Sequence, residues 1–210
     1  MNIVIFGPQG SGKGTQARKL AEKFGLMHFS IGELLREVAK TRPEIDEVVN
    51  KEGELLPDEV TMDIVAGFLE ERNKFDDIIF DGFPRNMNQH NLLRDWLASK
   101  GKKIDVGILI NISDTESVRR LSGRRKDPKT GKTYNLLTNP PGPEVDVSRL
   151  EQREDDKEEA VKTRLSIYHE ESAPIASVLE AESTLITVEG EREVDEIFED
   201  IVASLERINE

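Results

Sequence analysis

The sequence of 210 residues contains no cysteine and only three histidines. The absence of cysteine excludes a disulfide framework and a thiolate-bound metal site. The histidines are His28, His90 and His169, and their spacing matches no metal-ligand pattern. We therefore expect each histidine to fill a surface or edge position, and we assign none of them to catalysis.

Basic residues are also scarce, with 29 lysines and arginines against 42 acidic residues and a formal net charge of −13. A field of that sign repels nucleic acid and anionic membrane surfaces. The chain has no apolar run of 18 residues, and no signal peptide follows Met1. We expect a cytoplasmic protein with no nucleic-acid or membrane partner, in which any bound polyanion needs a local cluster of arginines.

The most informative stretch is a short apolar run, residues 2–6, followed by Gly7-Pro8-Gln9-Gly10-Ser11-Gly12-Lys13-Gly14-Thr15. The run is β-branched and bounded by Gly-Pro, as buried strands are, and helical spacing of apolar residues follows over 15–24. Strand, glycine loop, lysine and helix predict a phosphate-binding loop, because backbone N–H groups and a helix N-terminus converge there. Thr15 comes one position later than the usual Mg²⁺-binding hydroxyl, and Gly14 takes its place. This variant points away from generic ATPases and GTPases.

A second apolar strand, residues 77–81, ends in Asp81. A carboxylate at the C-terminal end of a strand is typical of sites that order Mg²⁺ and its waters. The turn that follows places Arg85 beside that strand end. Residues 73–76 match the NKxD guanine-reading pattern of GTPases, but they precede the strand, and we interpret the match as coincidence.

Strand and helix patterns alternate along the whole chain. Strands are predicted at 2–6, 27–30, 77–81, 106–112 and 184–188. Helices are predicted between and after them, including 43–51, 87–97 and 157–169, with Ser30, Asp58 and Asp114 as N-caps. The alternation predicts an α/β fold with a parallel, doubly wound sheet and a ligand at the carboxyl ends of the strands.

Arginines flank a stretch, residues 126–150, that is rich in proline and glycine. Such a stretch inside a compact protein is either disordered or a functional lid, and its alternating residues around Tyr134 favour a small β-rich flap. Arg120 and Arg124 are four residues apart and would share a helix face, where like charges repel unless an anion binds. Arg153 and Arg164 would face the same way if one helix carries both.

In combination, these motifs resemble those of the adenylate kinase family of nucleoside monophosphate kinases, nearly end to end. Residues 7–15 are similar to its P-loop, including the glycine after the lysine, and residues 81–85 to its most specific signature. Residues 123–125 and 153–156 resemble the start and the end of its lid. Arg164, in a Lys-Thr-Arg-Leu context, resembles the last arginine of the family.

The resemblance implies a P-loop NTPase-type five-stranded parallel sheet flanked by helices, with two insertions. The core would comprise residues 1–30, 61–124 and 154–210, with an NMP-binding insertion at 31–60 and a lid at 125–153. The implied activity is reversible, Mg²⁺-dependent transfer of the γ-phosphoryl of ATP to AMP, giving two ADP.

The resemblance also implies roles for individual residues. ATP would contact Gly10, Ser11, Gly12, Lys13, Gly14, Thr15, Arg120, Arg124 and the backbone near Arg192. AMP would contact Ile31, Arg36, Leu56, Gly82, Arg85, Gln89, Arg153 and Arg164. The catalytic set would be Lys13, Arg85, Arg124, Arg153 and Arg164, and Asp81 would hold Mg²⁺ through water.

Two departures from the family pattern keep alternatives open. Ile31 stands where many members carry threonine at the acceptor base, so a kinase of broader or different acceptor specificity is the first alternative. Many family lids bind zinc through four cysteines; here polar residues fit three of the four positions, with Val145 near the last, and no zinc is expected. These polar residues are Asp127, Thr130 and Ser148. A non-catalytic nucleotide switch is the second alternative, disfavoured by the arginines, and we expect a monomer while leaving an oligomer open.

Overall fold

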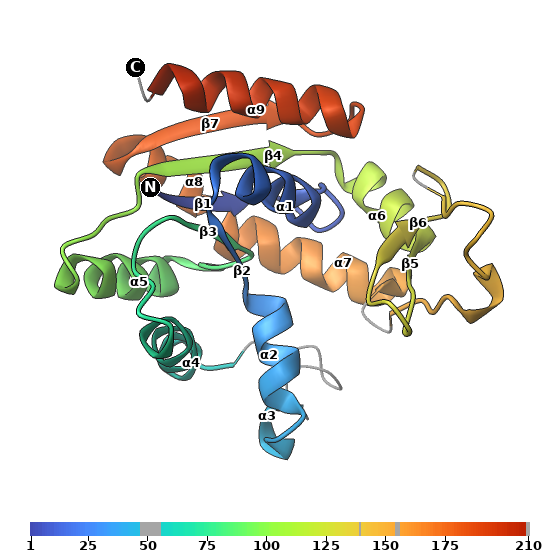
Figure 1. Cartoon of the computed structure of the whole chain (residues 1–210), viewed down its shortest axis with the longest axis horizontal. Helices are drawn as coiled ribbons and strands as arrows, with labels where there is room; N and C mark the ends of the chain where they lie inside the picture. The colour runs from blue at the N-terminus through green and yellow to red at the C-terminus, as the bar shows by residue number, and fades with distance from the viewer. Residues whose placement is uncertain (47–55, 139, 154–155, 209–210) are drawn as a thin grey trace.

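The computed structural model describes residues 1–46, 56–138, 140–153 and 156–208. Its centre is a parallel sheet with the strand order β2-β3-β1-β4-β7 (Figure 1). The strands are β1 (Asn2–Phe6), β2 (Met27–Ser30), β3 (Ile78–Asp81), β4 (Val106–Asn111) and β7 (Thr184–Glu189). The five predicted strands and the predicted α/β class are confirmed.

The central strand β1 is buried along its whole length. Ile3 and Ile5 pack into the hydrophobic cluster on one face of the sheet, and Val4 and Phe6 pack into the cluster on the other. After β1 the chain builds β2 and β3 on one side and then β4 and β7 on the other. The loop after β1 therefore lies where the strand order reverses, which is where open α/β sheets bind ligands.

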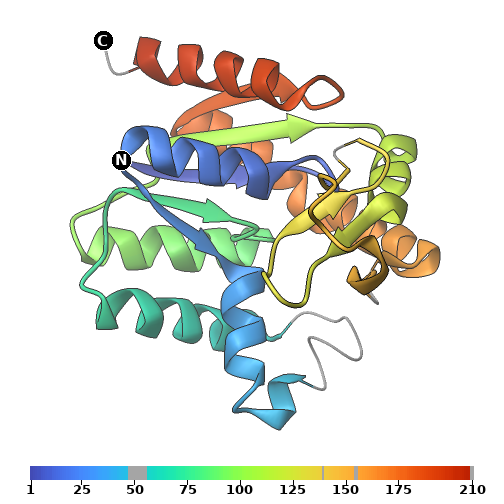
Figure 2. The same ribbon diagram turned by 45° about the vertical axis from the view of Figure 1, so that its right-hand side comes forward.

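Helices cover both faces of the sheet. On one face lie α1 (Lys13–Phe24) and α9 (Val194–Ile208), which share a buried cluster with the strands. On the other face lie α4 (Asp58–Glu71), α5 (Met87–Ser99) and α8 (Pro174–Glu182). Figures 1 and 2 show α9 on one side of the sheet and α4 and α5 on the other.

Two helices, α2 (Ile31–Ala39) and α3 (Pro43–Asp46), project from the sheet after β2 (Figure 1). Buried Ile31 and Leu35 join α2 to the core cluster that α4 also enters. The helix predicted at 43–51 is observed as far as Asp46, and its remainder lies outside the described residues.

A second small sheet lies apart from the central sheet, at the right of Figure 1, beside α6 (Asp114–Gly123). Helix α6 leads into β5 (Arg124–Lys126), which pairs antiparallel with β6 (Thr133–Asn135). The short 3₁₀ helix η2 (Val147–Arg149) follows, and a single bridge joins Lys126 to Glu151. The stretch predicted as a flap thus carries β structure.

Neither of the two arginine pairs lies on a single helix: the prediction for Arg120 and Arg124 is wrong, and the condition set for Arg153 and Arg164 is not met. Helix α6 ends at Gly123, because Arg124 adopts extended backbone angles (φ −69°, ψ 135°) and begins β5. Arg120 and Arg124 therefore do not share a helix face. Helix α7 (Glu158–Ile167) begins well after Arg153, so Arg153 and Arg164 do not lie on one helix either.

The predicted helix ends also need correction. Helix α7 does not stop near residue 169 but continues through a π-helical segment, η4 (Tyr168–Ser172), into α8. Ser113 rather than Asp114 caps α6, with its hydroxyl accepting the N–H of Glu116 at 3.2 Å. Pro57 occupies the N-cap of α4, and Ser30 begins α2 without a side-chain cap bond. The carboxylate of Asp58 does not cap α4 and instead accepts hydrogen bonds from Asn86, Asn88 and Gln89.

His90 does not lie at the surface or an edge. Its side chain is buried on the inner face of α5, with Nε2 at 3.0 Å from a carboxylate oxygen of Glu182.

Among the described helices, none has both the length and the apolar character that a membrane span requires.

Candidate active site

The loop between β1 and α1 is held by its backbone. Gly7 has φ +141°, and a Cβ there would lie 2.2 Å from the carbonyl oxygen of Ile110, so any side chain would collide with β4. The hydroxyl of Ser117 donates to the carbonyl of Gln9 and ties the loop to α6. Gly12 stands in the N-cap position of α1, so the loop leads directly to the helix N-terminus.

Lys13 lies in a setting that disfavours its own charge. Its Nζ donates to the carbonyl oxygens of Gly7 (2.7 Å) and Pro8 (2.8 Å). Burial lowers the pKa of Lys13 to about 8; Asp81 opposes this shift, and the positive charges of Arg164, Arg124 and Arg85 add to it. These three arginines thus come from distant parts of the chain and lie close enough to act on Lys13. A bound polyphosphate would relieve their mutual repulsion.

Asp81, at the carboxyl end of β3, faces the start of α1. A Cβ at Gly14 would lie 3.1 Å from Oδ2 of Asp81, which explains why glycine follows the lysine. Oδ2 also lies 3.2 Å from Nε2 of His28, a half-buried residue on the edge strand β2, so the predicted edge position of this histidine is confirmed. One carboxylate beside a phosphate-binding loop fits Mg²⁺, which keeps most of its waters and uses few protein ligands. Within the described part of the chain, no three His, Asp or Glu side chains converge to hold a metal directly.

A buried carboxylate, Asp156, joins two of the predicted arginines. Arg124 donates through Nε to Oδ2 of Asp156 at 2.7 Å and through Nη2 to Oδ1, and Nη1 of Arg164 lies 4.0 Å from Oδ1. The N–H of Asp156 donates to the carbonyl of half-buried Arg153 at 3.1 Å, which ties the backbone of this third arginine to Asp156. Sequence reasoning quoted Asp156 only as part of a motif and missed its role as the anchor of this group.

Three hydrogen bonds fix Arg85, which lies in the turn after β3. Its Nε donates to the carbonyl of Gly82 at 3.0 Å, and its own carbonyl accepts the hydroxyl of Ser172 at 2.5 Å. Its backbone N–H donates to Oε1 of Gln89 at 2.8 Å. The π-helical segment η4 thus connects α7, which carries Arg164, to the turn that carries Arg85.

The remaining predicted acceptor residues lie on α2 and beside it. Ile31 is buried, with Cγ2 at 3.5 Å from the position of a Cβ on Gly82, so these two residues adjoin. The guanidinium of Arg36 folds back over Gly32 on the same helix. Leu56 is buried in the core cluster that includes Ile31.

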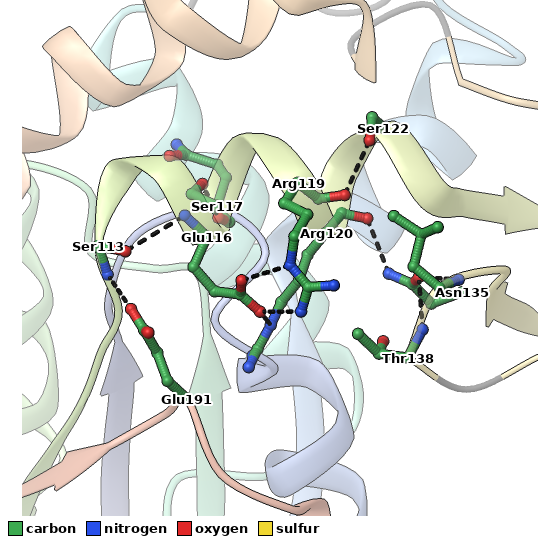
Figure 3. A network of polar contacts seen from close by, with 11 residues as sticks. Ser113, Glu116, Ser117, Arg119, Arg120, Ser122, Asn135, Thr138 and Glu191 are labelled. Carbon is green, nitrogen blue, oxygen red and sulfur yellow. Dashed lines mark hydrogen bonds and ion pairs between the residues drawn. The ribbon is translucent and has the colours of Figure 1, made fainter.

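On the other side of the P-loop, α6 carries a polar network (Figure 3). Glu116 accepts Nε of Arg119 and Nε of Arg120, each at 2.6 Å. The pKa of Glu116 is lowered to about 2, mainly by the hydrogen bond from Arg119. Burial opposes this shift, and the hydrogen bond from Arg120 adds to it. Asn135 of β6 donates to the carbonyl of Arg120 at 2.8 Å, which fastens the small sheet to α6. Arg120 is therefore fixed between a carboxylate and the small sheet.

The side chain of Arg192 turns away from this network. Its Nη2 pairs with Asp200 on α9, and the neighbouring Glu191 accepts the N–H of Ser113 at 2.7 Å (Figure 3). The loop before α9 is thereby tied to the start of α6. This geometry agrees with a contact through the backbone near Arg192 and not through its guanidinium.

A salt bridge that sequence reasoning missed braces the flap. Arg149 donates to buried Asp127 through Nε at 3.1 Å and Nη2 at 2.7 Å, and Thr130 donates to the same carboxylate at 2.9 Å. Of the three polar residues that stand at the positions of the zinc-binding cysteines, Asp127 and Thr130 are therefore in contact with each other. Ser148 instead donates to Asp146 at 2.7 Å, so it contacts a different carboxylate.

The fold and the site define a P-loop α/β protein that gathers lysine and arginine at the strand ends. A sequence profile of the adenylate kinase family matches residues 5–184. The adenylate kinase of Kosmotoga olearia is 38% identical over 216 residues, covering 99% of this chain and 100% of that protein. Those of Salinibacter ruber and Methanosarcina barkeri are each 37% identical, over 213 and 215 residues, covering 99% of this chain and 100% and 99% of those proteins. The chain belongs to the adenylate kinase family, whose members are phosphotransferases that act on nucleoside monophosphates.

Proposed function

We propose that the chain transfers the γ-phosphoryl group of MgATP to the phosphate of AMP, reversibly, giving two ADP. The observation that carries the proposal is the position of Lys13, a half-buried residue whose ammonium donates to the P-loop carbonyls of Gly7 and Pro8, close enough to Arg85, Arg124 and Arg164 for their charges to act on it. Four cations from separate elements that act on one another, in a protein of net charge −13, match a polyphosphate.

In the proposed reaction a phosphate oxygen of AMP forms a bond to the γ-phosphorus, and the bond from that phosphorus to the β–γ bridging oxygen breaks. The electron pair of the broken bond stays on the β-phosphate of ADP. Because the attacking oxygen is already an anion, no general base has to remove a proton. Catalysis then rests on in-line positioning and on stabilising charge that spreads over the transferred group.

The cations divide between the two nucleotides in this proposal. Lys13 and the N-terminus of α1 hold the ATP phosphates, together with residues 10–15 of the loop. Arg124 and Arg164, which lie beside the carboxylate of Asp156, face the transferred phosphoryl together with Arg153, whose backbone carbonyl contacts the N–H of Asp156. Arg120, fixed by Glu116, lies against the adenine of ATP, which the backbone near Arg192 also contacts.

Asp81 is the residue that would hold Mg²⁺, through the water molecules of the ion. Bound Mg²⁺ supplies charge neutralisation and orientation of the phosphate oxygens. The contribution of the chain is to keep one carboxylate at the strand end, where Gly14 leaves space for it.

The acceptor nucleotide lies on the side of β3 and α2 in this proposal. Arg36 and Arg85 hold the AMP phosphate, and Gln89 reads the adenine. Ile31, Leu56 and Gly82 line the base, Leu56 through its backbone. The insertion at 31–60 and the lid at 125–153 would close over both nucleotides and exclude water, because water would otherwise hydrolyse ATP.

The decisive experiment measures ADP formation from MgATP with AMP, GMP, UMP and CMP as separate acceptors. We expect rapid turnover with AMP and little with the other three. Equal turnover with several acceptors would favour the broader nucleoside monophosphate kinase, for which Ile31 is the specific observation. Absence of ADP formation with every acceptor would leave only a nucleotide-binding switch.

We also propose that the protein acts as a monomer in the cytoplasm. Light scattering on a gel-filtration peak should give the mass of one chain, 23.7 kDa. Twice that mass would overturn the proposal of a monomer without affecting the proposed reaction.

A further inference from the structure

The side chain of Gln89 is buried between two partners of fixed polarity. Its Nε2 donates to Oδ1 of Asp58 at 2.8 Å, and its Oε1 accepts the backbone N–H of Arg85 at 2.8 Å. A carboxylate can only accept a hydrogen bond, and a backbone N–H can only donate one. Rotating the amide by 180° would break both bonds and set oxygen against oxygen and N–H against N–H.

The partner of Gln89 is itself fixed and ionised. Asn86 donates to Oδ1 of Asp58 and Asn88 donates to Oδ2, each at 3.0 Å. Burial raises the pKa of Asp58, but the donors Asn88, Asn86 and Gln89 together outweigh it and lower the pKa below its usual value. Asn86 in turn accepts the backbone N–H of Gln89 at 2.8 Å, so the start of α5 and the start of α4 are joined through these amides.

The orientation of an amide matters for reading a purine. Adenine presents a donor at N6 and an acceptor at N1, whereas a 6-oxopurine such as guanine or hypoxanthine presents an acceptor at O6 and a donor at N1. With its two structural bonds made, Gln89 keeps one N–H and one oxygen lone pair for a base. An amide that turns freely can match either pattern, but a fixed amide matches only one and leaves unpaired polar groups against the other.

We propose that Asp58 is a positioning residue that locks the amide of Gln89 in one orientation and thereby makes the acceptor site select adenine over 6-oxopurines. The inference rests on the proposed function, since it concerns the acceptor base of that reaction. It assigns a role in base selection to a residue that would not itself touch the nucleotide.

The test compares AMP with IMP, whose base, hypoxanthine, lacks the 2-amino group of guanine and so isolates the N1 and position-6 contacts. In the wild-type protein kcat/KM for AMP should exceed that for IMP by at least about a hundredfold. Asp58→Asn, whose amide both donates and accepts, should reduce this ratio at least tenfold, with a lower KM for IMP and an unchanged KM for ATP. Glu59→Gln is the matched control, because it removes one negative charge from an exposed neighbouring position on α4 and should leave the ratio unchanged.

Each result has a separate meaning. If the wild type makes ADP from AMP but uses IMP equally well, or if Asp58→Asn keeps the wild-type ratio, the lock is wrong and the proposed function stands. If the wild type makes no ADP from AMP, the proposed function is wrong and the lock has no reaction to serve. Should Asp58→Asn fail to fold, Asp58→Ser offers a smaller group that also donates and accepts, with the same expected loss of the ratio.

Discussion

The P-loop and the proposed lid, the segment that carries β5 and β6, are built by different means. In the P-loop it is the backbone that is closely packed: Gly7 lies against the carbonyl of Ile110, Gly12 is the N-cap of α1, and the side chains of Ser117 and Lys13 donate to loop carbonyls. The lid is held by side chains: Arg149 and Thr130 converge on buried Asp127, and Asn135 fastens β6 to α6. The P-loop should therefore be sensitive to added atoms, and the lid to changes of charge.

The difference shows how each region can respond to a ligand. A loop built from buried strands and backbone contacts is set in place before any nucleotide binds. A small sheet joined by ion pairs and one bridge can open at lower cost, as moving lids must. Arg124 stands at the junction of the two, as the first residue of β5 with its guanidinium on Asp156.

The largest effect is expected for the arginine at the junction. Arg124→Ala should lower turnover by about 10³-fold or more, since a transition-state arginine supplies on the order of 10³–10⁵ in phosphoryl transfer. Arg125→Ala, which removes the same side chain one position along β5, is the control and should lose little. A coupled assay of ADP formation measures both. A mere twofold loss for Arg124→Ala would remove this residue from the catalytic set.

In the P-loop, the next largest effect should come from one methyl group. Gly7→Ala places a Cβ 2.2 Å from the carbonyl oxygen of Ile110 at a positive φ, and we expect the free energy of unfolding to fall by about 3 kcal/mol or more. Gly101→Ala is the control, because its φ is also positive (+70°) but the space around it is open. Urea unfolding of the two variants should differ clearly. Equal losses would show that strain in φ alone, and not the contact with β4, governs the loop.

The lid should respond to charge instead. Arg149→Ala leaves buried Asp127 without its ion-pair partner, so the amide hydrogens of Lys129 and Gly131 should exchange about tenfold faster while those of β1 keep their rates. Arg149→Lys keeps the charge but not the paired donors and should fall between the two. Unchanged exchange in Arg149→Ala would mean that the salt bridge does not brace the lid.

The same salt bridge gives the lid a pH dependence. Arg149 lowers the pKa of Asp127 below its usual 3.8. Because the folded value is the lower one, the stabilisation is fully present above pH 3.8 and is lost as the pH falls through the folded value. Lid exchange rates, corrected for intrinsic chemistry, should therefore converge between the wild type and Arg149→Ala only in strong acid. Convergence near neutral pH would contradict this assignment.

The smallest expected effect concerns Lys13. With its pKa lowered to about 8, the lysine loses its charge as the pH rises through that value, and ATP binding should weaken roughly fourfold between pH 7 and 8.5. Lys13→Arg stays charged and should show no such slope. Titration calorimetry at several pH values measures the affinity of each protein for ATP. A flat profile in the wild type would show that the lysine keeps its charge without a ligand.

Local patterns in the sequence were enough to predict the sheet and the P-loop. β1, the glycine loop and Lys13 are contiguous in the sequence, so a single local pattern contains all the residues that define the P-loop. His90 was misplaced although the information was present, because His90, Leu93 and Leu97 recur at helical spacing and all three are buried. Its position in this pattern, and not its polarity, decides its burial.

Contacts between distant segments could not be predicted in the same way. Asp156 meets Arg124 across 32 residues, and Asp127 meets Arg149 across 22. Asp58 has the sequence signal of a helix cap, yet its carboxylate accepts three amides from the start of α5. In each case the sequence shows the charge but not which partner the fold brings to it.

The central claim is that two mononucleotides meet end to end where β1 and β3 finish. Calorimetric titration with two adenosines joined by five phosphates tests it most directly, in the presence and absence of AMP and of ATP. The account predicts one ligand bound per chain, with either nucleotide alone weakening its binding. Two ligands per chain, or binding that AMP leaves unchanged, would contradict a shared site.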